Sequence, residues 1–242
     1  MNQGNILAID IGGSHIKASI IDPRGTVRQH YQAVKTPKKP EPGKVIEMIR
    51  ELVKDFPTFG KVSVGFPGYV DKGVVMTAPN LGTDKWYGTP FRERLETLFG
   101  KPVQVLNDAD LLGLGLIHGK GREMVVTLGT GFGTALFYNG ALQPHLELGQ
   151  HPFTSKHTYD RYIGAKALAR EGAEKWNKRL KKVISVLQTV FNYDHLYISG
   201  GNAEEINFAL DKNISVVSAK DGMRGGAKLW MTAEEEVVLQ EL

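Results

Sequence analysis

Two segments of the chain share one pattern that strongly limits how it can fold: a short apolar run, a glycine-rich break and a second apolar run. The first segment runs from Ile6 to Ile21 with its break at Gly12-Gly13-Ser14, and the second runs from Met124 to Tyr138 with its break at 129–133. Apolar runs separated by turn residues are typical of β-hairpins. We therefore predict two similar strand–turn–strand openings, and two related domains with a cleft between them.

Other elements follow the same alternation of strand and helix. Apolar residues recur at helical spacing over 45–56, 91–99 and 180–191, and 203–210 also has a helical pattern. Buried-looking strands are expected at 62–66, 103–106 and 196–199, and a third strand after the turn at 22–25. The proline-rich stretch 35–42 is expected to be a surface loop. Thr89-Pro90 is expected to start a helix, with threonine as the cap.

This alternation predicts the α/β class. We divide the chain into an N-terminal α/β domain at 1–108 and a C-terminal α/β domain at 109–242, and we expect the acidic tail 234–242 to be peripheral.

The composition narrows the function. Hydrophobic residues make up 41% and charged residues 23% of the 242, which is ordinary for a globular protein. The absence of cysteine excludes disulfides, thiolate nucleophiles and thiolate metal sites. No apolar run is long enough to span a membrane, and the N-terminus lacks the features of a signal peptide, so we expect a cytoplasmic protein. A net charge of +4 is too small to indicate nucleic-acid binding.

The two glycine-rich breaks are candidate phosphate sites, because glycine lets backbone N–H groups approach a phosphate closely. In the first, Asp10 precedes the turn and is able to hold a hydrated Mg²⁺, an ion that prefers oxygen ligands and keeps several waters. Plain hairpin turns remain the alternative for both breaks. The candidate phosphate-binding residues are Gly12, Gly13, Ser14, Lys17, Gly129, Thr130, Gly131 and Gly133.

Asn107-Asp108 follows a predicted strand and opens an apolar helix. Asparagine and aspartate are both good helix caps. A carboxylate at this position is also a candidate general base for a substrate hydroxyl, and the two roles do not exclude each other.

Other polar groups follow predicted strands. Gly65 to Val70, which includes Gly68, and Ala78 to Leu81 are rigid turns, and Asn80 offers an amide to a polyol. Glu147 is a candidate bidentate acceptor for two sugar hydroxyls, whereas His145 and His151 are expected to be surface histidines. Gly200-Gly201 lies at a strand-to-helix junction that is able to admit an adenine ring or a phosphate. A purely structural loop is the alternative at each place.

In this order, the motifs resemble those of the ROK family of sugar kinases, within the actin/hexokinase/Hsp70 ATPase superfamily, over about residues 5–230. Among these kinases the polyphosphate glucokinases are the most similar. The resemblance implies two ribonuclease-H-like domains and transfer of a phosphoryl group from polyphosphate or ATP to the 6-hydroxyl of glucose, with Mg²⁺. It implies a homodimer that binds neither nucleic acid nor membrane.

The resemblance also assigns roles to residues. Asp108 would deprotonate the sugar, and Asp10 would position Mg²⁺ through water. Asn80, Asn107, Glu147, Gly68 and Gln150 fall in the sugar-side motifs, and Gly200 and Gly201 in the adenosine motif.

The chain departs from the family pattern at two points. Many members carry a zinc-binding segment rich in cysteine, which is absent here as it is from polyphosphate-using members, so no zinc is expected. Gln150 stands where the family has histidine, with His151 beside it, and this leaves the identity of the sugar open.

A polyphosphate donor needs a track of positive charge. The sequence offers two clusters. One lies in the proline-rich loop, at Lys35, Lys38, Lys39 and Lys44, and the other is expected on one helix, at Arg170, Lys175, Lys178, Arg179, Lys181 and Lys182. Solvated surface is the alternative for both.

Other functions remain open. They are an ATP-dependent kinase of another hexose or of an amino sugar, and a non-catalytic sugar- or phosphate-binding module. A sugar-sensing repressor is disfavoured, because the first phosphate motif begins too early to leave room for a DNA-binding helix-turn-helix.

Overall fold

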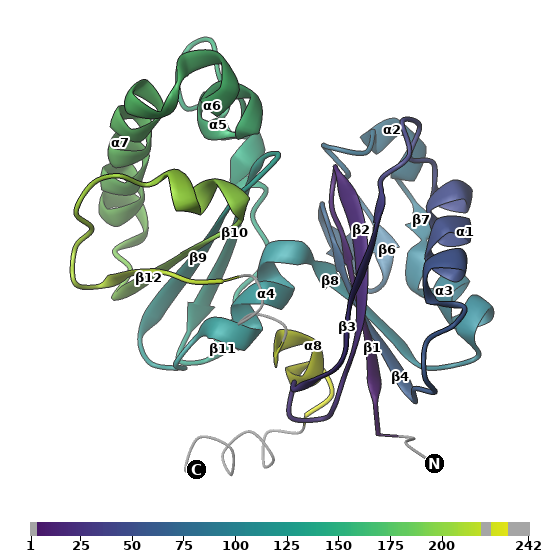
Figure 1. Ribbon diagram of the computed structural model, residues 1–242. Helices are drawn as coiled ribbons and strands as arrows, with labels where there is room; N and C mark the ends of the chain where they lie inside the picture. The colour runs from purple at the N-terminus through teal and green to yellow at the C-terminus, as the bar shows by residue number, and fades with distance from the viewer. Residues whose placement is uncertain (1–3, 219–223, 232–242) are drawn as a thin grey trace. The chain divides into compact units, whose positions relative to one another are not determined.

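The computed structural model describes residues 4–218 and 224–231. These residues form two compact units (Figure 1). Unit 1 contains residues 4–115 and 224–231, and unit 2 contains residues 116–218. The domain boundary expected after residue 108 stays a prediction, and the tail 234–242 lies outside the described residues.

Unit 1 is built on a mixed sheet that begins with the first glycine-rich hairpin. Its strand order is β3 (Val27–Lys35), β2 (His15–Ile21), β1 (Ile6–Ile11), β4 (Lys61–Phe66) and β8 (Val103–Asn107). β1 pairs with β2, and β2 with β3, in antiparallel fashion, whereas β1–β4 and β4–β8 are parallel. The predicted hairpin, the third strand and the two later strands are confirmed.

Helices cover both faces of this sheet (Figure 1). On one face, α1 (Pro42–Val53) and α3 (Phe91–Phe99) bury Val45, Ile49, Phe91 and Leu95 against strand residues such as Ile9. On the other face lie α4 (Asp108–Leu116) and α8 (Arg224–Lys228), and Ala227 packs against Ile6 and Ile21. The Ser63 hydroxyl fixes α8 to the sheet by donating to the Gly226 carbonyl at 2.6 Å.

A small antiparallel sheet completes unit 1. It contains β5 (Val70–Asp71), β6 (Val74–Val75) and β7 (Thr89–Pro90), and α2 (Thr83–Trp86) precedes β7.

Three predicted boundaries in unit 1 are wrong. Lys35 was expected in the loop, but it is the last residue of β3 and pairs with His15. Pro42 belongs to α1 rather than to the loop, because proline is tolerated in the first helical turn, where its missing N–H would have no intrahelical partner. Thr89 does not cap a helix. Thr89 pairs with Val75 across the small sheet, and α3 begins at Phe91.

Unit 2 repeats the arrangement with the second glycine-rich hairpin. Its strand order is β11 (Ala141–Leu142), β10 (Phe132–Tyr138), β9 (Arg122–Leu128), β12 (His195–Ser199) and β13 (Ile214–Val216). β9 and β10 are antiparallel, and β12 is parallel to both β9 and β13. The second hairpin and the α/β class are therefore confirmed.

Helices α5 (Tyr159–Ile163), α6 (Ala165–Glu171) and α7 (Ala173–Phe191) lie on one face of this sheet (Figure 1). They enclose a core that includes Trp176, Leu180 and Leu187 against Met124 and Val126. Short 3₁₀ helices, η1 (Leu148–Gln150) and η2 (Gly201–Glu205), follow β11 and β12 along the chain.

Two expectations for unit 2 are corrected. The helix expected over 203–210 is only the 3₁₀ turn η2, because the buried Asn177 side chain bonds to the Glu205 carbonyl and the Asn207 N–H and holds that backbone out of a helix. Arg170 lies on α6 and not on α7, because Gly172, with φ of 78°, separates the two helices.

Within the described ranges, no helix is long and apolar enough to cross a membrane.

Candidate active site

In unit 1, two carboxylates gather on one face of the sheet. Asp10, near the end of β1, pairs with Lys17 on β2 and with Gly65 on β4, and paired residues point to the same face. The Lys17 Nζ lies 3.7 Å from the Asp10 Oδ2. A Cβ atom on Gly65 would lie 3.4 Å from the Asp108 Cα, so Asp108 sits directly over this part of the sheet.

Burial and the neighbouring Lys17 have opposite effects on the pKa of the Asp10 carboxyl. Desolvation raises the pKa of the Asp10 carboxyl, and the Lys17 ammonium opposes this rise by favouring the charged form. The Asp10 side chain is still 46% exposed, so it is accessible to a ligand.

The Gly12-Gly13-Ser14 turn is fixed by its own backbone and by a neighbouring segment. The Gly12 N–H donates to the His15 carbonyl at 2.8 Å. Thr36 donates its hydroxyl to the Gly12 carbonyl at 2.7 Å and its N–H to the Ser14 carbonyl at 2.9 Å. The turn is therefore held in one conformation beside the Asp10–Lys17 pair.

Asn107 holds the start of α4. Its side-chain oxygen accepts from the N–H groups of Ala109 and Asp110, at 2.8 and 3.2 Å, as a helix cap does. Its Nδ2 donates to the carbonyls of Phe66 and Gly68, at 3.4 and 3.3 Å. One buried side chain thus ties the end of β4 to the helix that carries Asp108, and the predicted cap is confirmed for Asn107.

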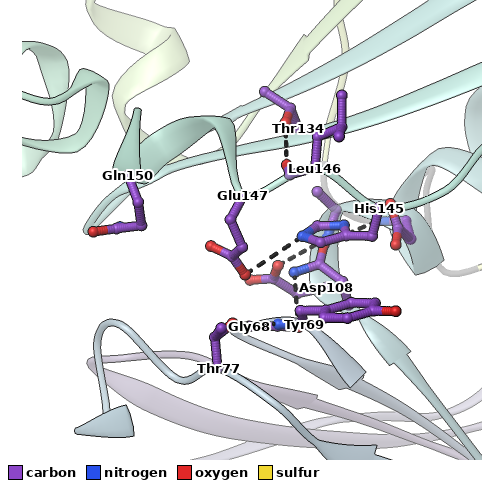
Figure 2. Close-up of polar contacts among 12 residues, drawn as sticks. Gly68, Tyr69, Thr77, Asp108, Thr134, His145, Leu146, Glu147 and Gln150 are labelled. Carbon is purple, nitrogen blue, oxygen red and sulfur yellow. Dashed lines mark hydrogen bonds and ion pairs between the residues drawn. The ribbon is translucent and has the colours of Figure 1, made fainter. Parts of the chain in front are cut away.

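The two sugar-side loops pack together. A side chain at Gly68 would collide with the Thr77 carbonyl, and the Tyr69 N–H donates to the Thr77 hydroxyl at 2.8 Å (Figure 2). Asn80 follows in a turn before α2, with an exposed side chain.

In unit 2, the loop at 129–131 lies against Gly200. Gly200 has φ of 97°, and a side chain there would collide with the Leu128 carbonyl. The Gly129 carbonyl accepts from Asn202 Nδ2 at 3.1 Å and from the Ala165 N–H at 2.9 Å. Unit 2 therefore brings together the second glycine-rich break and the Gly200-Gly201 junction, which lie far apart in the sequence.

The segment around Glu147 runs beside β10. Thr134 donates its hydroxyl to the Leu146 carbonyl at 3.2 Å, and the His145 Nε2 lies 3.4 Å from the Glu147 Oε1 (Figure 2). His145 was expected at the surface, but its side chain is only 6% exposed. The Gln150 amide donates to the Asp160 Oδ2 at 2.7 Å, so Asp160 fixes its orientation.

Asp160 is a site residue that sequence reasoning missed. Its other oxygen accepts from the Phe132 N–H at 2.6 Å, and its carboxylate occupies the space that side chains at Gly131 and Gly149 would fill. Burial raises the pKa of this carboxyl, against the two hydrogen bonds that favour its charged form. In the sequence Asp160 looks like an ordinary acid in the first turn of a helix, so no pattern marks it.

The described residues include no cluster of three or more histidine, aspartate or glutamate side chains able to hold a metal ion. Unit 1 gathers Asp10, the 12–14 turn, Lys17, Gly68, Asn107 and Asp108. In unit 2, Gly200 lies against the start of the loop that holds Gly129, Thr130, Gly131 and Gly133, with Gly201 next to it, and Asp160 links this loop to Gln150, in the segment that also holds Glu147.

Comparisons with known proteins place this arrangement in a family. The model of the ROK family matches residues 6–151, and the chain belongs to that family. Polyphosphate glucokinase of Mycobacterium tuberculosis is 35% identical over 209 residues, which cover 82% of this chain and 78% of that protein.

Solved structures of sugar kinases are also similar to this chain. The crystal structure of an inorganic polyphosphate/ATP-glucomannokinase from Arthrobacter sp. strain KM has a TM-score of 0.84 and 30% identity, and covers 98% of this chain and 99% of that one. A ROK family glucokinase from Streptomyces griseus, in complex with glucose and AMPPNP, has a TM-score of 0.78 at 20% identity, over 93% and 99% of the two chains. The second likeness supports the fold.

Proposed function

We propose that this chain is a sugar kinase that transfers a phosphoryl group from polyphosphate or ATP to the 6-hydroxyl of glucose. The observation that carries the proposal is the position of Asp108, held by Asn107 over Gly65 on the face that bears Asp10 and Lys17. The polyphosphate glucokinase and the glucomannokinase named above support the choice of donor and sugar.

Asp108 is the proposed general base. The sugar 6-oxygen forms a bond to the terminal phosphorus of the donor while the bond from that phosphorus to the bridging oxygen breaks. The hydroxyl proton passes to the Asp108 carboxylate, and the shortened donor leaves with the electron pair of the broken bond. Phosphoryl transfer requires mainly positioning and charge stabilisation from a protein, so a fixed carboxylate is sufficient on this side.

The two glycine-rich breaks are the proposed phosphate-binding groups. Backbone N–H groups at the 12–14 turn and the 129–133 loop, with Lys17 and the Thr130 hydroxyl, supply donors for phosphate oxygens. Gly200 and Gly201 border the second loop and are the proposed place for an adenosine group when ATP is the donor.

The proposed sugar-side residues are Asn80, Asn107, Glu147, Gly68 and Gln150. Glu147 offers two acceptor oxygens, and Asn80 has an exposed amide. Gln150 already donates to Asp160, which directs its side-chain oxygen toward other donors. A wider choice of hexose is the alternative, which the glucomannokinase favours.

Mg²⁺ is the proposed cofactor. Asp10 offers an accessible carboxylate, and the described residues hold no group of three or more acids or histidines able to hold a metal ion. This fits Mg²⁺, which binds through one or two carboxylates, donor phosphates and water, and which would supply charge neutralisation of the transferring phosphoryl group. Asp10 would hold it through water.

The test is direct. The purified chain is incubated with glucose and Mg²⁺, with polyphosphate and with ATP in separate reactions, and the product is identified by ³¹P NMR. We expect glucose 6-phosphate with at least one donor. If no phosphorylated sugar forms with either donor, from glucose or from other hexoses, the result would favour the non-catalytic binding module. The homodimer implied by the family resemblance and the expected cytoplasmic location stay predictions.

A further inference from the structure

We propose that the polyanionic tail of the donor binds along a basic loop in unit 1, defined here as 35–41 with Lys35, Lys38 and Lys39. The inference rests on the proposed use of polyphosphate, and it chooses between the two basic clusters that the sequence offers. The choice is based on two observations: the basic loop adjoins a phosphate-binding turn, and its lysines form no ion pair in the described part of the chain, whereas most cations of the helix cluster do.

The basic loop starts directly beside the first glycine-rich turn. Lys35 pairs with His15 at the edge of the sheet, and the next residue, Thr36, makes the two bonds to Gly12 and Ser14 described above. The loop and the turn are therefore one connected surface. A phosphate chain whose end lies at the turn reaches Lys35 first, and then Lys38 and Lys39.

The loop is also rigid. The buried Trp86 anchors its far end by donating its ring N–H to the Pro40 carbonyl at 2.6 Å. Prolines at 37, 40 and 42 restrict the backbone between the two anchors. Charges on such a loop bind a polyanion with a smaller loss of conformational entropy than charges on a flexible loop.

The lysine side chains are available. Lys35, Lys38 and Lys39 are all exposed, and in the described part of the chain none of them forms an ion pair. Glu41 is the one acid in the stretch 35–44, which also contains Lys44. The loop thus presents a net positive charge that internal pairs do not neutralise.

The helix cluster, Arg170 to Lys182 on α6 and α7, is different. Glu171 accepts from three cations: Lys175 at 2.6 Å, Arg170 at 2.9 Å and Arg179 at 3.0 Å. These bonds lower the pKa of Glu171 to about 2, so the carboxylate is charged at neutral pH.

The remaining cations of the helix cluster also have partners. Lys178 pairs with Glu174 at 2.8 Å, and Lys181 and Lys182 lie over the rings of Phe208 and Phe153. Four of the six cations in the helix cluster thus share two acidic partners, and the other two lie over aromatic rings of unit 2. Its side chains are engaged in contacts within unit 2, whereas the lysines of the basic loop are exposed.

The experiment compares two triple variants that remove the same charge. The loop variant is Lys35→Ala/Lys38→Ala/Lys39→Ala, and the matched control is Lys178→Ala/Lys181→Ala/Lys182→Ala. Steady-state kinetics are measured with long-chain polyphosphate, tripolyphosphate and ATP. Equilibrium binding of fluorescently labelled long-chain polyphosphate is measured in parallel, at low and high salt.

In the loop variant we expect KM for long-chain polyphosphate to rise about tenfold and its salt dependence to weaken, because each exposed ionic contact contributes modestly and is screened. The kinetics with ATP and tripolyphosphate should change less than about twofold, since short donors end before Lys38. The control variant should resemble the wild type with all three donors. If KM for long-chain polyphosphate is unchanged in the loop variant, or rises more in the control variant, the inference is overturned.

The binding measurement separates this inference from the proposed donor. If the wild type turns over ATP but not polyphosphate, the sugar kinase proposal stands with ATP as its donor, and polyphosphate is excluded as a donor. Labelled polyphosphate that binds the wild type and not the loop variant would then still support the basic loop as a polyanion site. Equal binding to both, or none to either, would refute it.

Discussion

In unit 1, the Asn107 side chain makes four hydrogen bonds to backbone groups on two segments. The sequence predicts the two bonds to the N–H groups of α4, because asparagine before an apolar helix indicates a cap. The bonds to Phe66 and Gly68 depend on the parallel pairing of β4 with β8, which no local pattern encodes. The same limit applies to Asp160, whose partners Phe132 and Gln150 come from two separate segments of unit 2.

Replacing Asn107 by alanine should therefore cost more than the loss of an ordinary cap. We expect Asn107→Ala to lower the free energy of unfolding by about 2 to 3 kcal/mol, because two buried carbonyls and a helix N–H lose their partner. Urea denaturation checks this. Thr158→Ala, which removes the exposed cap of α5, is the control and should cost about 1 kcal/mol or less. Equal losses in both variants would contradict the bridging role.

At the scale of elements, both hairpins could be predicted from the local sequence, because each turn contains glycines between two apolar runs. The starts of helices were harder to predict from the sequence. Thr89-Pro90 has the composition of a helix start, but pairing with β6 satisfies its backbone instead. The turn at 22–25, predicted from Asp-Pro-Arg-Gly, is held by Asp22, which accepts from the N–H groups of Arg24 and Thr26 and from Arg28.

This turn predicts a pH dependence. Burial of Asp22 disfavours its charge, but the two backbone N–H groups and Arg28 outweigh burial, so the pKa of the carboxyl is lowered. A depressed pKa contributes stability above the unfolded value of about 3.9, and this contribution is lost as pH falls through the folded value. Asp22→Asn should thus cost about 1 kcal/mol at pH 7 and progressively less below pH 4.

Thermal unfolding of Asp22→Asn between pH 3 and pH 7 checks this, with the exposed Asp55→Asn as control. A difference from the wild type that stays constant over this pH range would show that the carboxylate charge is not involved.

At the scale of the molecule, the sequence predicts two units of the same α/β type, and the strand orders confirm the class, since each sheet joins an antiparallel hairpin to parallel strands. Within unit 2, residues distant in sequence meet in a way that the sequence does not predict, for example Leu128 and Gly200. The sequence did not distinguish the two basic clusters, because charge counts do not reveal which cations have acidic partners.

The most direct test of the account is glucose phosphorylation by the wild type and by Asp108→Asn, measured side by side with polyphosphate and with ATP. Loss of a positioned general base typically lowers kcat 10²- to 10⁴-fold, so we expect a decrease of about 10³-fold with either donor. Glucose affinity, measured by calorimetry, should remain detectable, and Asp55→Asn should retain full activity. A kcat in Asp108→Asn within about tenfold of the wild type would show that Asp108 is not the base.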